Sequence, residues 1–237
     1  MAVNSMESFG PELLKLAQII WINIILSGDN AVVIALACRG LPENKQRVGM
    51  ILGAFVAVAL RIVFTILVAT LLSTPFLKIL GGCLLLWIAV KLVLGEEEQG
   101  GAVKETDRLW HAVRTVAIAD AVMSLDNVLA IAAVAEGSTV LLVIGLAISI
   151  PLIIAGAALV MALLARFPIM VWAGAALLGR VAGEMIVSDP WLLDSLGEPF
   201  LHRLELPADA LCAAFVVGLG FFLSRRAANR IEFEQNA

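Results

Sequence analysis

The chain has 237 residues, of which 61% are apolar and only 15% are charged. Soluble domains hold about 45–50% apolar and about 25% charged residues, and a chain this apolar would leave too much apolar surface in water. The composition therefore excludes an ordinary soluble enzyme, a disordered protein and a disulfide-stapled module, and it indicates a membrane protein with several spans. The net charge of −4 argues against a nucleic-acid partner, which would need a basic face.

Seven apolar runs follow one another along the chain. About 20 apolar residues cross a bilayer as a helix, and only a helix pairs its own backbone groups in lipid within one segment. The predicted class is therefore an all-α membrane protein with seven transmembrane helices. Their expected bounds are Leu13–Ala37, Val48–Leu72, Phe76–Leu94, Ala112–Ala135, Thr139–Ala165, Ile169–Val187 and Ala208–Leu223.

The residues outside these runs are expected to be connections. Residues 95–109 contain three consecutive glutamates and a Gly-Gly pair, a composition typical of a solvated linker. Residues 189–207 are expected to form a second linker, and residues 225–237 a tail. The first fourteen residues hold two glutamates and no Lys or Arg, which is the wrong flank for a cleaved signal peptide, so we expect the first helix to be retained.

The basic residues near the ends of these helices predict the orientation. Lys and Arg concentrate in cytoplasmic loops, and here ten lie on one side against three on the other. We therefore expect integration into the inner (cytoplasmic) membrane with the N-terminus outside and the C-terminus in the cytoplasm. The ten are Arg39, Lys45, Arg47, Lys104, Arg108, Arg114, Arg166, Arg225, Arg226 and Arg230, and the three are Lys15, Lys78 and Arg203.

A polar motif occurs twice, in the first and fourth predicted helices. The pattern Ser-x-Asp-Asn stands at residues 27–30 and again at residues 124–127, and apolar residues follow both copies. Each half would hold three helices, and because three is odd the second half must enter from the opposite face. The sequence thus predicts two inverted repeats, at about residues 12–94 and 110–188, followed by a last helix at about 208–224. Inverted repeats with polar residues near the midplane are a recurring transporter plan.

Three aspartates fall inside the apolar spans: Asp29, Asp120 and Asp126. An ionised Asp near a bilayer centre costs about 2.5–3.5 kcal/mol on insertion scales, which favours a functional role. Positions i, i+3, i+4 and i+7 share a helix face, and Asp120, Met123, Ser124 and Asn127 follow that spacing. In the first helix Asn23, Leu26, Ser27 and Asn30 form the matching stripe, with Asp29 beside it.

Carboxylate, amide and hydroxyl oxygens suit a hard or borderline divalent cation such as Mn²⁺, Mg²⁺ or Ca²⁺. Met123 would add a soft ligand, although a helical Met more often only packs. Asn30 and Asn127 could instead join helices by hydrogen bonds, and Ser27 and Ser124 could bond their own backbone. The predicted ligands are Ser27, Asp29, Asn30, Asp120, Met123, Ser124, Asp126 and Asn127.

Other residues in the spans have local interpretations as well. Arg61, midway along the second predicted helix, could neutralise the carboxylates or pair elsewhere in the bundle. Gly28 could mark a local helix break, but Leu125 stands at the matching position of the second copy. Crowded carboxylates in a low dielectric hold protons, which an arriving metal would displace. Proton–metal antiport is therefore a plausible mechanism.

The two motif copies, with the stretches Leu80–Leu92 and Ala173–Gly179, resemble the TerC family of integral membrane proteins, and most its short YjbE-type branch. The resemblance covers residues 12–224. It implies one TerC-like domain with a seven-helix fold related to lysine-exporter-type transporters, export of Mn²⁺ from the cytoplasm, and a metal role for Asp29, Asp120 and Asp126. It also implies a link to tellurium resistance, which is indirect if the ion is Mn²⁺, and in some relatives to membrane-protein assembly and the metalation of exported proteins.

Three alternatives stay open beside metal export. An amino-acid exporter would need a cationic or helix-N-terminal partner for the substrate carboxylate. An intramembrane aspartyl protease would use two Asp on different helices to activate water, but the chain lacks the Gly-x-Gly-Asp pattern, so we expect no enzymatic activity and no prosthetic group. A membrane-biogenesis partner would not depend on the carboxylates at all.

Overall fold

The computed structural model describes residues 14–21, 27–72, 74–95, 105–135 and 139–235. Within these ranges the chain is helical and contains no β-strand. After a helical segment at residues 14–21 come α2 (Gly28–Cys38), α3 (Glu43–Leu72), α4 (Leu77–Leu94), α5 (Glu105–Ala135), α6 (Thr139–Arg166), α7 (Met170–Val187), α8 (Pro190–Leu196) and α9 (Glu198–Gln235).

Five helices of the described chain are long and apolar enough to cross a membrane: α3, α4, α6, α7 and α9. Many of their large apolar side chains face outward, among them Phe55, Leu80 and Leu159. An outward apolar surface would be unstable in water and is stable against lipid chains. The prediction of an all-helical membrane protein is therefore confirmed.

The first predicted span is not one helix in the described residues. Residues 14–21 are helical, residues 22–26 lie outside the description, and Ser27 has turn geometry with φ −110° and ψ 3°. A new helix, α2, then begins at Gly28. The predicted fourth span, by contrast, lies inside the continuous helix α5. The two copies of the motif therefore have different backbones.

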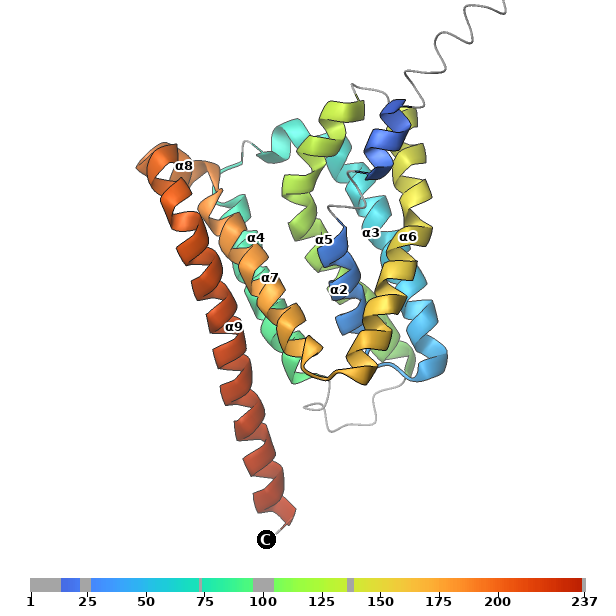
Figure 1. The fold of residues 1–237 in the computed structure, drawn as a ribbon, viewed down its shortest axis with the longest axis vertical. Helices are drawn as coiled ribbons and strands as arrows, with labels where there is room; N and C mark the ends of the chain where they lie inside the picture. The colour runs from blue at the N-terminus through green and yellow to red at the C-terminus, as the bar shows by residue number, and fades with distance from the viewer. Residues whose placement is uncertain (1–13, 22–26, 73, 96–104, 136–138, 236–237) are drawn as a thin grey trace, which may run out of the picture.

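The helices divide into two groups, which Figure 1 shows side by side. In one group α7 packs between α4 and α9, and in the other α3 packs on α5 and α6 while α2 packs on α6 and α5. Helices of the first half of the chain also contact helices of the second half. These contacts are α2 with α6, α3 with α5, α4 with α7, α4 with α5, and α2 with α7. Apolar clusters fill both groups, and the second cluster continues across to α2 and α5.

Small residues, Gly179 and Gly183, bring α7 against α9. A Cβ atom at Gly183 would lie 2.8 Å from the carbonyl oxygen of Ala208, and one at Gly179 would lie 2.8 Å from the carbonyl oxygen of Cys212. These positions exclude any side chain, because the obstructing atoms are backbone. Glycine therefore sets the distance between the two helices.

Several predicted bounds are wrong at the polar ends of the helices. Residues 105–109, predicted as linker, form the first turns of α5. The predicted linker 189–207 is helical from Pro190, and Pro207 lies inside α9, which continues through the predicted tail to Gln235. Hydropathy marks the apolar part of a helix, whereas its backbone hydrogen bonds continue into polar residues.

Asp189 joins two helix starts and was missed in the sequence. Its side chain is fully buried and accepts hydrogen bonds from the backbone N–H of Trp191 (2.9 Å), Phe76 (3.1 Å), Lys78 (3.1 Å) and Ile79 (3.3 Å). The first N–H groups of a helix lack partners within it, and a carboxylate there is stabilising. One carboxylate thus fixes the beginning of α8 beside the beginning of α4.

Candidate functional site

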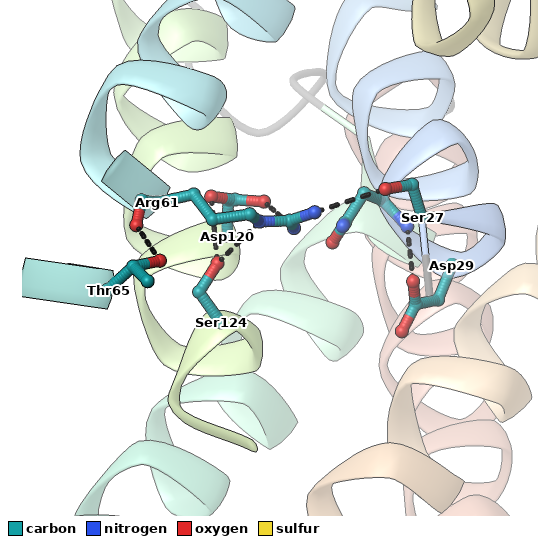
Figure 2. A network of polar contacts seen from close by, with 7 residues as sticks. Ser27, Asp29, Arg61, Thr65, Asp120 and Ser124 are labelled. Atoms are coloured by element: carbon teal, nitrogen blue, oxygen red, sulfur yellow. Dashed lines mark hydrogen bonds and ion pairs between the residues drawn. The ribbon is translucent and has the colours of Figure 1, made fainter. Parts of the chain in front are cut away.

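A buried polar cluster lies among α2, α3 and α5 and is centred on Arg61 (Figure 2). The guanidinium donates from Nη2 to Asp120 Oδ1 at 2.8 Å, from Nε to Ser124 Oγ at 3.2 Å and from Nη1 to Ser27 Oγ at 3.1 Å. Ser124 Oγ also donates to Asp120 Oδ2 at 3.1 Å. We call Ser27, Arg61, Asp120 and Ser124 the Arg61 cluster.

The side chains of the Arg61 cluster are withdrawn from the molecular surface. Arg61 is 1% exposed, Asp120 2%, Ser27 5% and Ser124 0%. Buried polar groups in folded proteins are almost always hydrogen-bonded, and each member of the cluster has at least one partner within it. The buried ion pair between Arg61 and Asp120 is thus hydrogen-bonded on both of its members.

Helix α5 supplies two members of the cluster through its periodicity. Asp120 and Ser124 are four residues apart on one continuous helix, so they share a face, as the sequence predicts. Arg61 is presented by α3, where Thr65 Oγ1, four residues on, donates to the Arg61 carbonyl oxygen at 2.7 Å. Thr65 was missed in the sequence, and its i+4 spacing from Arg61 is the signal that could have found it.

The first motif copy contributes through the start of α2. Ser27 immediately precedes the helix, and its hydroxyl accepts from Arg61 rather than capping α2. Asp29 stands in the first turn, half-buried, and its Oδ1 accepts the backbone N–H of Asn30 at 2.8 Å. Figure 2 shows Asp29 beside Ser27 on the α2 side of the cluster. Asp29 thus lies beside the cluster and makes its hydrogen bond within the first turn of α2.

Asn30 is the least satisfied polar side chain near the cluster. It is 3% exposed, and neither its Oδ1 nor its Nδ2 has a hydrogen-bond partner in the part of the chain that the structure describes. It lines a narrow space together with Asp120 and the apolar residues Val33, Ile34, Ala57 and Val116. A buried amide without a partner costs about 1–3 kcal/mol, which marks this side chain for a role other than stability.

Of the remaining predicted ligands, the structure describes the side chain of Met123 alone, and it lies outside the cluster. Met123 is 3% exposed and packs in the apolar cluster shared by α2, α4, α5 and α7. Asp126 and Asn127 lie on α5 by their backbone, but their side chains fall outside what the structure describes. The second copy of the Asp-Asn pair therefore stays a prediction.

The cluster offers oxygen donors together with a built-in cation. Asp120, Ser27 and Ser124 supply a carboxylate and two hydroxyls, and Asn30 adds a buried amide. Among the described residues no three His, Cys, Asp or Glu side chains gather as a metal-binding group. In this arrangement Arg61 supplies the positive charge that Asp120 requires in an apolar environment.

Known proteins similar to this chain agree with the membrane fold. The family described as "Integral membrane protein TerC family" matches residues 9–230. The "Uncharacterized membrane protein YjbE" of Bacillus subtilis (strain 168) is 45% identical over 205 residues, which is 86% of this chain and 93% of YjbE.

Two further proteins of the same organism match over shorter lengths. The "Uncharacterized membrane protein YceF" is 33% identical over 131 residues, covering 52% of this chain and 51% of YceF. The "Uncharacterized membrane protein YkoY" is 28% identical over 116 residues, covering 47% of this chain and 36% of YkoY. No solved structure matches the chain. The family match spans nearly the whole chain and includes every member of the Arg61 cluster, so the chain belongs to the TerC family of integral membrane proteins.

Proposed function

We propose that this chain exports a divalent metal ion from the cytoplasm, with Mn²⁺ as the main substrate. The observation that carries the proposal is the Arg61 cluster: an Arg–Asp ion pair, 1% and 2% exposed, that joins Ser27 of the first motif copy to Ser124 of the second. Ionisable groups inside a membrane are costly and mark substrate or ion pathways by default. A purely structural contact between helices would not need a full charge of each sign.

In the proposed mechanism Arg61 takes the place of the metal when the ion is absent. A cation that reaches Asp120, Ser27 and Ser124 would compete with the guanidinium for the same oxygens. Asn30 Oδ1, buried beside Asp120, would then gain a partner. Displacement of Arg61, or of a proton from a neighbouring carboxylate such as Asp29 or Asp126, would couple metal binding to charge movement. Proton antiport is the form of coupling that we propose.

The choice of Mn²⁺ rests on ligand chemistry and on the family resemblance. Carboxylate, amide and hydroxyl oxygens suit Mn²⁺, Mg²⁺ and Ca²⁺, whereas Zn²⁺ and Cu⁺ favour imidazole and thiolate. Met123 packs among apolar residues, so we do not propose it as a principal ligand. The chain would act as a transporter and not as an enzyme.

Two features support a seven-span architecture of two inverted repeats. In two such repeats α2 would correspond to α5, α3 to α6 and α4 to α7. The α2–α6 contact then corresponds to α5–α3, and the α4–α5 contact to α7–α2, and all four contacts occur. In addition, the ends of α2, α4, α6 and α9 that carry the basic residues lie at one end of the bundle (Figure 1). We propose that this end is cytoplasmic.

The test is ion flux in proteoliposomes that hold the full chain and a fluorescent Mn²⁺ reporter, with Mg²⁺, Ca²⁺ and Zn²⁺ in parallel. We expect wild type to move Mn²⁺, and Asp29→Asn, Asp120→Asn and Asp126→Asn to lose most of the flux. Asp194→Asn is the matched control, because Asp194 is exposed on α8 and far from the cluster in sequence. Melting temperatures of all variants separate loss of transport from loss of fold.

Two results would contradict the proposal. Wild type that moves none of these ions, with or without a pH gradient, removes the transport function and favours a role as a membrane-protein assembly or metalation partner. Flux that survives in all three carboxylate variants leaves transport in place but removes the site.

A further inference from the structure

A second polar feature lies away from the Arg61 cluster, at the end of the bundle where α2 and α4 finish and α5 begins. A cavity of about 690 Å³ opens there between the two groups of helices. Its lining includes five basic side chains and one acidic side chain, Asp107. The basic residues are Arg39, Lys91, Arg108, His111 and Arg114. None of them belongs to the Arg61 cluster.

Contacts with the walls hold three of the basic side chains, Arg39, Lys91 and His111, at the cavity. Arg39, after the end of α2, donates from Nη2 to the carbonyl oxygens of Leu92 and Val93 in the last turn of α4, at 3.0 and 3.1 Å. Lys91 Nζ lies 3.2 Å from His111 Nε2, which joins α4 to α5. Arg39, Lys91, Arg108 and His111 are half-buried, and Arg114 is exposed. Positive charge is thus fixed on three sides of one cavity.

The other walls are apolar and reach the outer surface of the bundle. Leu84, Ile88 and Leu92 of α4 and Ile118 of α5 line the cavity. Trp87 also lines it and is 57% exposed, with Lys91 Nζ 5.1 Å from its ring centroid. A Trp beside a Lys at a helix end is typical of the membrane–water interface. The cavity therefore joins a basic head region to an apolar flank that faces lipid.

The charge of the cavity does not fit a pathway for the proposed metal. Among the lining residues that the structure describes, four side chains that are cationic at neutral pH, against one carboxylate, would repel a divalent cation and attract an anion. Basic pockets between transmembrane helices on the cytoplasmic side are suited to phosphate head groups, and Arg matches phosphate by paired donors.

We propose that this cavity binds a phosphate-bearing anion whose apolar part lies against Leu84, Trp87 and Ile88, the chemistry of an acidic phospholipid. The phosphate would contact Arg108, Arg114 and Lys91, and Arg39 would hold the α4 wall in place. A bound lipid would bridge the two groups of helices at the seam between α4 and α5. This site does not depend on the proposed metal transport.

The test uses the full chain in nanodiscs and native mass spectrometry after detergent release. Phosphatidylglycerol and the zwitterionic phosphatidylcholine are compared, with inorganic phosphate added as a competitor. The cavity variant is Arg108→Gln with Arg114→Gln. The control is Lys45→Gln with Arg47→Gln, which removes the same charge near the start of α3 and outside the cavity lining. Gln46 of that segment bonds the carbonyl oxygens of Arg39 and Leu41, so the control lies at the same end of the bundle.

We expect wild type and the control to retain one phosphatidylglycerol, and the cavity variant to bind it roughly thirtyfold more weakly, as two lost contacts to anionic lipid imply. If inorganic phosphate binds as tightly as phosphatidylglycerol and displaces it, the cavity is a phosphate site whose ligand is a soluble anion and not a lipid. Equal retention by both variants, or equal retention of phosphatidylcholine, would overturn the proposal. If the double variant fails to fold, Arg114→Gln alone, at an exposed position, gives the same comparison.

Discussion

Arg61 is the side chain on which the interior of the helix bundle depends most. It donates to both serines of the repeated motif and to Asp120, and it is among the largest fully buried side chains. Removing both charges from water costs several kcal/mol for each ion, and good hydrogen-bond geometry offsets that cost without a large surplus. The pair therefore contributes little net stability, although breaking it is expensive.

That asymmetry leads to a prediction about stability. Arg61→Met leaves the Asp120 carboxylate buried without its cation and should destabilise the fold by about 3–5 kcal/mol. Adding Asp120→Leu to it removes the stranded charge and should restore most of the lost stability, seen as recovery of the melting temperature in detergent. Transport should stay absent in the double variant. A double variant less stable than both single variants would contradict this account.

The sequence predicted part of the cluster and not the rest, for reasons visible at single residues. Helical spacing alone placed Asp120 and Ser124 together, and the structure confirms it. It placed Asp29 beside the polar stripe but did not predict that α2 begins at Gly28, where Asp29 accepts a local N–H. It did not reveal the hydrogen bonds to Asp189 from the N–H groups of Phe76, Lys78 and Ile79, which join segments more than 100 residues apart.

Among the helices, α7 and α9 show how small residues replace side-chain packing. Gly179 and Gly183 face backbone atoms of α9, and Gly82 of α4 faces the carbonyl oxygen of Ala182 in α7, 2.8 Å from where a Cβ would lie. The helices α4, α7 and α9 therefore touch through their backbones. In lipid the hydrophobic effect does not drive helices together, because the lipid chains are as apolar as the side chains. Close van der Waals contact is therefore a main cause of helix association.

A single added methyl group should test this contact. Gly183→Ala would place a Cβ 2.8 Å from the Ala208 carbonyl oxygen, and overpacking of this kind costs about 1–3 kcal/mol. Gly218→Ala on α9 is the matched control, because nothing lies within 4 Å of its Cβ and alanine favours a helix. We expect the first variant to lower the melting temperature and the second to leave it equal or higher. Equal behaviour of both would argue against a backbone contact at Gly183.

The apolar part of each helix was more predictable than its full length. Apolar runs located α3, α4, α6 and α7 to within a few residues, because lipid contact requires apolar side chains over that length. The polar turns of α5 and α9 carry no such requirement. Their extension depends on hydrogen bonding and on neighbours such as α8, which hydropathy does not report.

At the scale of the whole molecule, the two polar sites lie in different places relative to the two groups of helices. Ser27, Arg61 and Asp120 all belong to α2, α3 and α5, so the candidate metal site lies within one group. The basic cavity lies where α4 meets α2 and α5. A relative movement of the groups would therefore change the cavity first. The repeat in the sequence did not predict this division.

The proposed orientation makes a prediction for the whole chain in cells. In a background with all three native cysteines replaced, Ser195→Cys on α8 should react with a membrane-impermeant maleimide on intact cells. Glu43→Cys at the start of α3 should react only after the membrane is opened. Both positions are exposed in the structure, so access and not burial decides the result. If Glu43→Cys and not Ser195→Cys reacts on intact cells, the proposed orientation is wrong and the opposite one holds.

Helix α9 is longer than the bilayer is thick. Its 38 residues extend about 57 Å at 1.5 Å per residue, whereas the hydrocarbon core is about 30 Å thick, and Figure 1 shows it running past the ends of the other helices. The glycines of α7 hold it between Ala208 and Ala213, and further along Phe221 still packs on Trp172 of α7. About 21 Å of helix continue beyond that contact. Each degree by which α9 tilts about the contact would move its far end by about 0.4 Å, and a dye placed there would report motion that begins inside the membrane.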